Sequence, residues 1–415
     1  MPHRSIFINK IRSVKMKKII GIVLVVIISL ILFINKNDNS PLSKSIKKNQ
    51  NKKIQSINWQ MFEGTQKLQR YASTDLGTAY KLKWSFNKHE GLTVPIFSDN
   101  KIYVGTGNGK VYVFTLESNK PVKILNICND TVTSQPLVYK NNIYIGTITG
   151  NFYSYNIIEN KIDWKINTEG KITGSANYYQ IDNQLYILFG SYDGYLYSIE
   201  ALTGKKQWTV ETDDFINGTP AIFKDNSRTV FGGCDGLVRV VNLRTGKQEF
   251  VYKLKSHIPS SPVIKNNNII CTEYSNKIVS FSFKDMYVVT WKYKSNKKGV
   301  TYIHSPAVSD NYLVTGDERG YLRVIELKTG KLKTEKRIGK KINTPLIFKN
   351  NRILVTTSRG VIKILDLTTL DVVWKYKTKI PIEHGAIPVN NGFAVTDNDG
   401  NLYVFEKKIT GGASK

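Results

Sequence analysis

The chain has 415 residues, 41% of them hydrophobic, so it is long enough to bury a large core. Its 60 Lys and Arg against 32 Asp and Glu give a formal net charge of +28, which favours acidic partners. Its three cysteines (Cys128, Cys234 and Cys271) include no CxxC pair, which excludes a disulfide framework and a cysteine-based zinc site. Nucleophile-elbow, Walker-loop and HExxH motifs are absent as well.

The first predicted element is an uncharged apolar run at residues 19–34 (IIGIVLVVIISLILFI), preceded by a basic N-terminal segment at residues 1–18. A helix of this length would span roughly 24 Å. No cleavage site of small residues follows, so we predict a single-pass transmembrane signal anchor that holds the propeller described below on the extracytoplasmic side of the cell membrane. Lysines on the far flank, at residues 36, 44, 47 and 48, weaken the charge asymmetry behind this orientation.

Residues 35–58 are polar and rich in Lys and Asn, a composition typical of disordered chain. We predict a flexible tether with a mean reach on the order of 27 Å.

A sequence motif then recurs at intervals of about forty residues. It consists of one glycine, a stretch in which apolar or aromatic residues alternate with others, and a turn. Its anchors are Gly109, Gly150, Gly194, Gly236, Asn276 in place of Gly, Gly320, Gly360 and Gly400. Repeats of this length with several short strands are typical of β-propellers. The prediction is an all-β, eight-bladed propeller of four-stranded antiparallel blades at residues 59–407, followed by a tail at 408–415.

The last repeat lacks a fourth strand, because the chain ends soon after residues 401–405. Residues 83–86 (KWSF) match the fourth-strand sequences DWKI at 163–166 and VWKY at 373–376. We therefore expect this N-terminal strand to complete the last blade and close the ring, which leaves no unpaired edge. The tryptophans at equivalent repeat positions (Trp164, Trp208, Trp291 and Trp374) are interpreted as interblade packing.

The segment YDGYLYSIEALTGKKQW at 192–208 resembles the repeats of the pyrroloquinoline-quinone-like propeller family. Residues 59–64 and 71–73 are similar to the lead-in common in that family. One branch of the family, the quinoprotein dehydrogenases, uses Ca²⁺, a catalytic Asp and a vicinal Cys pair, and this chain has no adjacent cysteines. No cofactor is therefore predicted.

A second branch contains non-enzymatic scaffolds, such as the propeller lipoprotein of the outer-membrane β-barrel assembly machine. The chain is similar to that branch in size and blade count, but it lacks a lipidated Cys and is basic. The resemblance implies a non-enzymatic protein-binding scaffold in cell-envelope protein assembly, whose partner the sequence does not name. A quinone- or ligand-binding enzyme is one alternative, and binding to anionic lipid or an envelope polyanion is another.

Two groups of residues are candidate sites. His257, His304 and His384 all lie in loops that precede a first strand, so they are expected near one mouth of the central channel, where they form a candidate ligand site. The candidate basic docking surface consists of Lys292, Lys294, Lys331, Lys333, Lys336, Arg337, Lys340 and Lys341. It would bind an anionic envelope surface, whereas nucleic acid is disfavoured because no stacking motif accompanies the charge.

Overall fold

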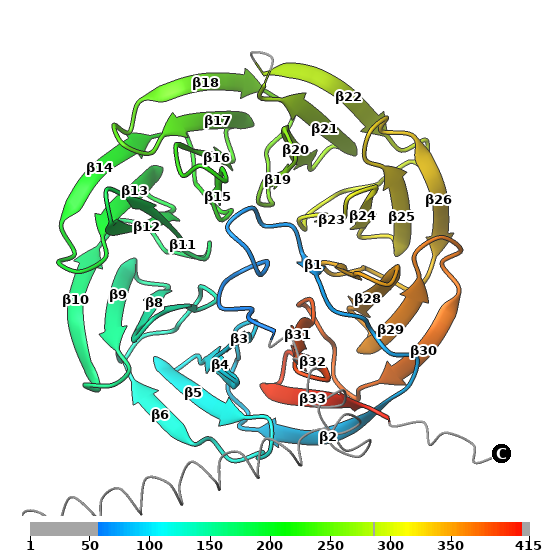
Figure 1. Cartoon of the computed structure of the whole chain (residues 1–415), viewed down its shortest axis with the longest axis horizontal. Helices are drawn as coiled ribbons and strands as arrows, with labels where there is room; N and C mark the ends of the chain where they lie inside the picture. The colour runs from blue at the N-terminus through cyan, green and yellow to red at the C-terminus, as the bar shows by residue number, and fades with distance from the viewer. Residues whose placement is uncertain (1–56, 285–286, 409–415) are drawn as a thin grey trace, which may run out of the picture. The chain divides into compact units, whose positions relative to one another are not determined.

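The computed structural model describes residues 57–284 and 287–408, and this part of the chain forms eight sheets around a common axis (Figure 1). Each sheet contains a four-stranded antiparallel blade, which confirms the predicted eight-bladed propeller. No helix in the described ranges has the length and hydropathy of a membrane span. The predicted anchor at 19–34 and most of the predicted tether lie outside the described residues.

Within each blade the strands are ordered from the channel to the outer rim, and the first four blades follow one another along the chain. Blade 1 is β3 (Ile96–Ser98), β4 (Lys101–Gly105), β5 (Lys110–Thr115) and β6 (Lys123–Asn126); blade 2 is β7 (Leu137–Tyr139), β8 (Asn142–Gly146), β9 (Asn151–Asn156) and β10 (Lys161–Asn167); blade 3 is β11 (Asn177–Ile181), β12 (Gln184–Gly190), β13 (Tyr195–Glu200) and β14 (Lys206–Glu211); blade 4 is β15 (Ala221–Ile222), β16 (Arg228–Gly232), β17 (Leu237–Asn242) and β18 (Gln248–Lys253).

The remaining blades continue in the same order, with two additional strands from the N-terminal side. Blade 5 is β19 (Val263–Lys265), β20 (Asn268–Glu273), β21 (Lys277–Ser282) and β22 (Val288–Lys294); blade 6 is β23 (Ala307–Val308), β24 (Tyr312–Gly316), β25 (Tyr321–Glu326) and β26 (Leu332–Arg337); blade 7 is β27 (Leu346–Phe348), β28 (Arg352–Thr357), β29 (Val361–Asp366) and β30 (Val372–Lys377), with β1 (Tyr71–Ala72) added in parallel; blade 8 is β31 (Ile387–Val389), β32 (Gly392–Thr396), β33 (Asn401–Lys407) and β2 (Tyr80–Asn87).

The repeated glycines are explained by backbone geometry in the turn between the second and third strands. All seven have positive φ, from 71° at Gly360 to 88° at Gly320. Asn276 adopts the same conformation, with φ of 72°. Glycine enters this left-handed region without steric cost, and asparagine is among the side chains that tolerate it best. The substitution in the fifth repeat therefore preserves the turn.

The core lies between the blades, because the second and third strands of each blade are covered on both faces by neighbouring blades. In β9 four consecutive residues are buried, whereas the outer strand β14 is exposed at most of its positions. Phe152 of blade 2 stacks on Phe189 of blade 3 with ring centroids 3.9 Å apart. Continuous burial explains why apolar residues dominate both faces of the middle strands instead of alternating with exposed polar residues.

The tryptophans join adjacent blades, as the sequence predicted. The indole Nε1 of Trp164 donates to the carbonyl oxygen of Ala201 in the next blade at 2.9 Å, and Trp208 makes the same bond to Leu243. The register of β10 against β9 shifts just before Trp164, and such a bulge re-aims the side chain that follows it.

The outermost strand of blade 8 comes from the N-terminal side of the propeller. Residues of β2 pair antiparallel with β33, with Trp84 opposite Val404. Trp84 donates to the carbonyl oxygen of Leu116 in blade 1 at 2.9 Å, and Trp374 of blade 7 donates to that of Tyr80 in β2. Trp84 thus makes the same contact to the next blade as Trp164 and Trp208 do, whereas the acceptor of Trp374 lies on the fourth strand β2 itself.

The chain upstream of β2 crosses the middle of the ring, where it appears in blue in Figure 1. This threaded segment, residues 57–72, offers its backbone carbonyl oxygens to the channel-facing edges of the first strands. The bonds run from Val138 N to Gln60 O (2.9 Å), Ile222 N to Gln66 O (2.8 Å), Ile264 N to Lys67 O (3.0 Å), Val308 N to Gln69 O (2.8 Å) and Ile347 N to Arg70 O (3.1 Å). The segment therefore ties separate blades to one another through the channel.

Candidate functional site

A row of side-chain hydroxyls lines the channel in blades 3 to 6, at the end of the loops that connect one blade to the next. The backbone N–H of Ser175 donates to the hydroxyl of Thr219 in the following blade at 3.0 Å. The N–H of Thr219 donates in turn to Ser261 at 2.7 Å, and that of Ser261 to Ser305 at 3.1 Å. We call Ser175, Thr219, Ser261 and Ser305 the hydroxyl belt. It links blades 3 to 6 at one level of the channel.

In blade 8 the residue equivalent to those of the hydroxyl belt is Gly385, which has no side chain. The side chain of Arg70, from the threaded segment, fills the space that this leaves. A Cβ atom at Gly385 would lie 2.6 Å from Nη2 of Arg70. The guanidinium donates from Nε to the carbonyl oxygen of Pro345 and from Nη2 to that of Ala386, both at 2.7 Å. Gly385 is therefore required for the arginine to reach the channel wall.

Glu63 is the buried partner of this arginine. Its Oε2 lies 3.1 Å from Nε of Arg70, and both side chains are almost fully buried. The Nε–H is directed at Pro345, so neither carboxylate oxygen accepts a hydrogen bond from the described residues. Burial raises the pKa of Glu63 to about 7, against the opposing influence of Arg70.

His304 and His384 reach the same cavity from blades 6 and 8. Burial, together with Lys341, His384 and Arg70, lowers the pKa of His304 to about 3, and burial also lowers the pKa of His384. Both rings are therefore neutral at pH 7. Atom Nε2 of His304 is buried and has no hydrogen-bond partner among the described residues.

His257, the third histidine of the predicted set, lies away from this pair. Its ring stacks on Tyr274 with centroids 4.5 Å apart. His89 is 76% exposed beside Asp399. Equivalent positions in the repeat thus bring two of the histidines, His304 and His384, to one cavity. Glu63 and Arg70 line the same cavity and were not predicted from the sequence.

The central cavity enclosed by these groups has a volume of about 330 Å³. Its wall includes Glu63, Arg70, His304, His384 and the hydroxyl belt. The described residues contain no group of three or more His, Cys, Asp or Glu side chains placed to hold a metal ion. Above about pH 7, where Glu63 is mostly ionised, it neutralises Arg70, and the described wall then lacks the free positive charge that an anionic quinone would need.

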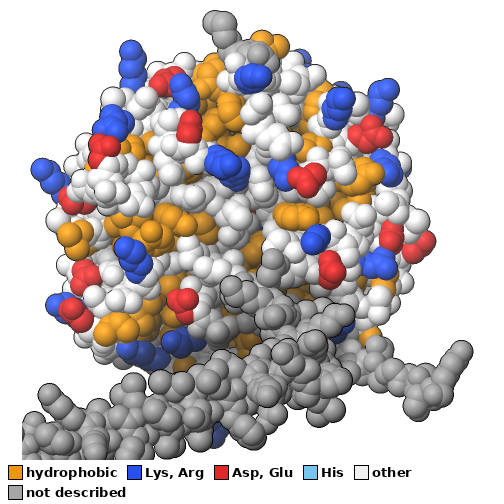
Figure 2. Space-filling model, viewed as in Figure 1, with side chains coloured by type: hydrophobic (Ala, Val, Ile, Leu, Met, Phe, Trp, Pro, Cys, Tyr) orange, Lys and Arg blue, Asp and Glu red, His pale blue; other side chains and the backbone are white. Residues whose placement is uncertain are grey.

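The predicted basic docking surface lies on the outer strands β22 and β26 and the loop that follows. Seven of its eight residues are exposed and Lys341 is half-buried. Two members have acidic partners, Lys336 with Asp371 at 3.0 Å and Lys341 with Glu383 at 2.9 Å. Figure 2 shows basic and acidic side chains interspersed around the visible rim of the propeller. These local ion pairs therefore reduce the positive electrostatic potential of the basic docking surface.

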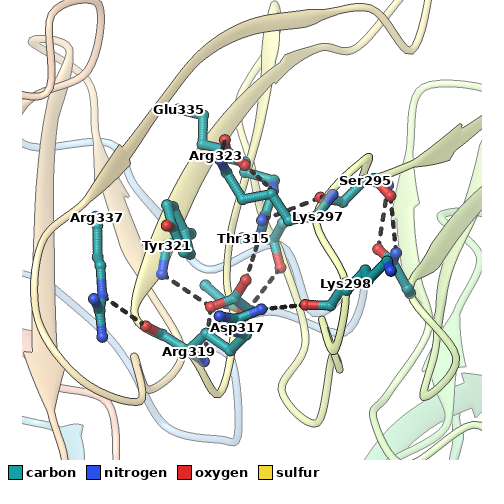
Figure 3. Close-up of polar contacts among 12 residues, drawn as sticks. Ser295, Lys297, Lys298, Thr315, Asp317, Arg319, Tyr321, Arg323, Glu335 and Arg337 are labelled. Atoms are coloured by element: carbon teal, nitrogen blue, oxygen red, sulfur yellow. Dashed lines mark hydrogen bonds and ion pairs between the residues drawn. The ribbon is translucent and has the colours of Figure 1, made fainter.

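Beneath that surface, a buried ion-pair network holds blades 5 and 6 together (Figure 3). Arg323 has no exposed surface and bridges Asp317 at 2.8 Å and Glu335 at 2.6 Å. Its Nη2 also reaches the hydroxyl of Ser295 in the neighbouring blade at 3.3 Å. Arg337, a member of the predicted docking surface, donates to the carbonyl oxygen of Arg319 at 3.2 Å. The basic residues of blade 6 thus rest on a rigid support.

A third surface was not singled out from the sequence. The turns between second and third strands lie at the same end of the blades as the interblade loops, because the strands are antiparallel. At this end, over blades 2 to 5, large apolar side chains are exposed. Ile148 is 50% exposed, Phe215 47% and Tyr274 41%. Tyr192 stacks on Phe215 with centroids 4.8 Å apart. We call Ile148, Tyr192, Phe215 and Tyr274 the aromatic arc. Exposed apolar groups gathered on one face are typical of protein interaction sites.

Comparisons with known proteins agree with this architecture. A family model described as outer membrane protein assembly factor BamB matches residues 129–286 and 288–409. The crystal structure of BamB from Moraxella catarrhalis is similar with a TM-score of 0.66 and 15% identity, covering 80% of this chain and 98% of that one. The computationally designed Ika8 protein gives a TM-score of 0.67 and 18% identity, covering 77% and 98%. No curated protein sequence matches the chain significantly. The two structural likenesses show the fold.

Proposed function

The chain belongs to the family of PQQ-like propellers described as outer membrane protein assembly factor BamB, and from this membership we propose that it is a non-enzymatic, protein-binding scaffold in cell-envelope protein assembly. The family match over both halves of the propeller is the observation that carries the proposal. The aromatic arc supports it, since it offers apolar area on a rigid ring of loops.

The proposal includes a location. A single N-terminal helix at 19–34 would anchor the chain in the cell membrane, and the tether would hold the propeller on the extracytoplasmic side. This arrangement rests on the apolar run and the basic residues before it.

The first test removes the most exposed aromatic side chain of the arc. Phe215→Ala should leave the fold intact, because Phe215 is 47% exposed, but should reduce the yield of correctly assembled envelope proteins in cells that carry the variant as their only copy. Leu202→Ala is the matched control, since Leu202 is 83% exposed in the turn at the opposite end of the strands. Equal envelope protein levels in both variants and the native strain would contradict the proposed role of this face.

A second candidate function, docking to anionic lipid or an envelope polyanion, is favoured by the exposure of the basic surface on β22 and β26. Such binding would weaken steeply with salt, because exposed charges are screened within about 8 Å at physiological ionic strength.

A further inference from the structure

The wall of the central cavity combines hydrogen-bond donors and acceptors around one space. The belt hydroxyls of Thr219, Ser261 and Ser305 each accept a backbone N–H, so each keeps its own O–H to donate. Glu63 supplies two carboxylate oxygens that accept no hydrogen bond from the described residues. Buried polar atoms of this kind are nearly always paired. A ligand hydroxyl, which both donates and accepts, matches both kinds of group.

Charge excludes other classes of ligand. Above about pH 7 Glu63 is mostly ionised and neutralises Arg70, and Lys341 is neutralised by Glu383 at 2.9 Å. The histidine rings that face the cavity are neutral, because burial disfavours their charged form. An anion would thus find no unpaired cation in the described wall, and no cluster there has the ligands for a metal ion. The wall favours a neutral ligand.

Shape and apolar contacts narrow the class further. The volume of about 330 Å³ lies at the lower end of the range of small-molecule sites. Phe62 and Val94 also line the cavity, and both extend into an adjoining hollow of about 370 Å³. An apolar surface beside many polar groups suits a ring that carries C–H bonds on its faces and hydroxyls at its edge.

We propose that the central cavity is a binding site for a small neutral polyhydroxyl ligand, such as a monosaccharide or the terminal sugar of a glycan. Glu63 accepts hydrogen bonds from ligand hydroxyls, the belt hydroxyls donate to ligand oxygens, and His304 Nε2 fixes the orientation of the ring. No residue of the aromatic arc lines this cavity, and the site does not depend on a protein partner.

Calorimetric titration of the full chain in detergent at pH 8, where Glu63 is mostly ionised, with D-glucose and N-acetylglucosamine tests the proposal, and D-glucuronate serves as the anionic counterpart. We expect at least one neutral sugar to bind and to raise the melting temperature, and glucuronate to bind at least about tenfold more weakly. Glu63→Gln and His304→Ala should each weaken sugar binding by about tenfold, since each removes a buried hydrogen-bond group. His89→Ala is the matched control, because His89 also lies in a loop before a first strand but is 76% exposed.

Three results would each overturn the proposal. The first is no heat of binding and no thermal shift with either neutral sugar, which would mean that water alone forms the hydrogen bonds of the polar groups in the cavity wall. The second is glucuronate binding as tightly as glucose. The third is sugar binding that is unchanged in both Glu63→Gln and His304→Ala, which would place the sugar elsewhere. If Glu63→Gln fails to fold, the His304→Ala variant alone decides the last comparison.

Discussion

Replacing Glu63 with glutamine should change how the stability of the propeller depends on pH. Burial raises the pKa of Glu63 from 4.5 to about 7, so between these values the folded chain holds a proton that the unfolded chain has released. The contribution of Glu63 to stability is therefore fully present below pH 4.5 and is lost as the pH rises to 7. Each pH unit of displacement corresponds to about 1.4 kcal/mol, so the loss amounts to roughly 3 kcal/mol.

Glutamine stays neutral throughout this range, as protonated Glu63 does. Urea titrations of the native chain and of Glu63→Gln at pH 4.5 and pH 8 should show that their difference in unfolding free energy shifts by roughly 3 kcal/mol in favour of the variant at the higher pH. Comparing the two pH values cancels any constant effect of the amide. Glu117→Gln, at a side chain that is 80% exposed, is the control and should give parallel curves. Parallel curves for Glu63→Gln, or a shift in the opposite direction, would refute the assignment of Glu63 as a buried acid whose ionisation is disfavoured.

Four further predictions address other parts of the structure. Trp208→Phe should cost about 1 kcal/mol in urea titrations, because it removes one of the two hydrogen bonds to Leu243 O and leaves only the bond from Tyr179. Gly385→Ala should cost about 1–3 kcal/mol by forcing Arg70 from the channel wall, whereas a melting temperature equal to the native one would contradict the close contact. The pKa of His304 is lowered to about 3, so its contribution to stability should be lost as the pH falls from 6.5 toward 3, and the native chain should lose more stability over this range than His304→Ala does. Lys333→Glu with Arg337→Glu, in a form lacking residues 1–56, should abolish salt-sensitive flotation with anionic liposomes; unchanged flotation would remove the basic surface as a docking site.

The blades could be predicted from the sequence because their determinants are local. A glycine at each turn between second and third strands is needed for its positive φ, and even Asn276 keeps that geometry at 72°. Trp164 and Trp208 recur at one repeat position because each has the same carbonyl partner in the next blade. The same repeat alignment placed His304 and His384 in equivalent loops, and the structure brings both to the cavity wall.

The centre of the channel could not be predicted, because the threaded segment has no periodic pattern. Its conformation is determined by blades far along the chain, such as the bond between Gln66 and Ile222. Glu63 and Arg70 both have positive φ, at 57° and 47°, which local propensity would not suggest for such side chains. The one available signal was the repeat position of Gly385, where a missing side chain leaves room for a guanidinium from elsewhere.

Site-specific photocrosslinking from the aromatic arc in intact cells tests the proposed scaffold function most directly. A photoreactive phenylalanine analogue at Phe215 should give a discrete crosslink to a protein of the cell-envelope assembly machinery, and the same analogue at Leu202 on the opposite face should not. Absence of any crosslink from Phe215, or the same products from both positions, would contradict the central claim that this face of the propeller binds an assembly partner.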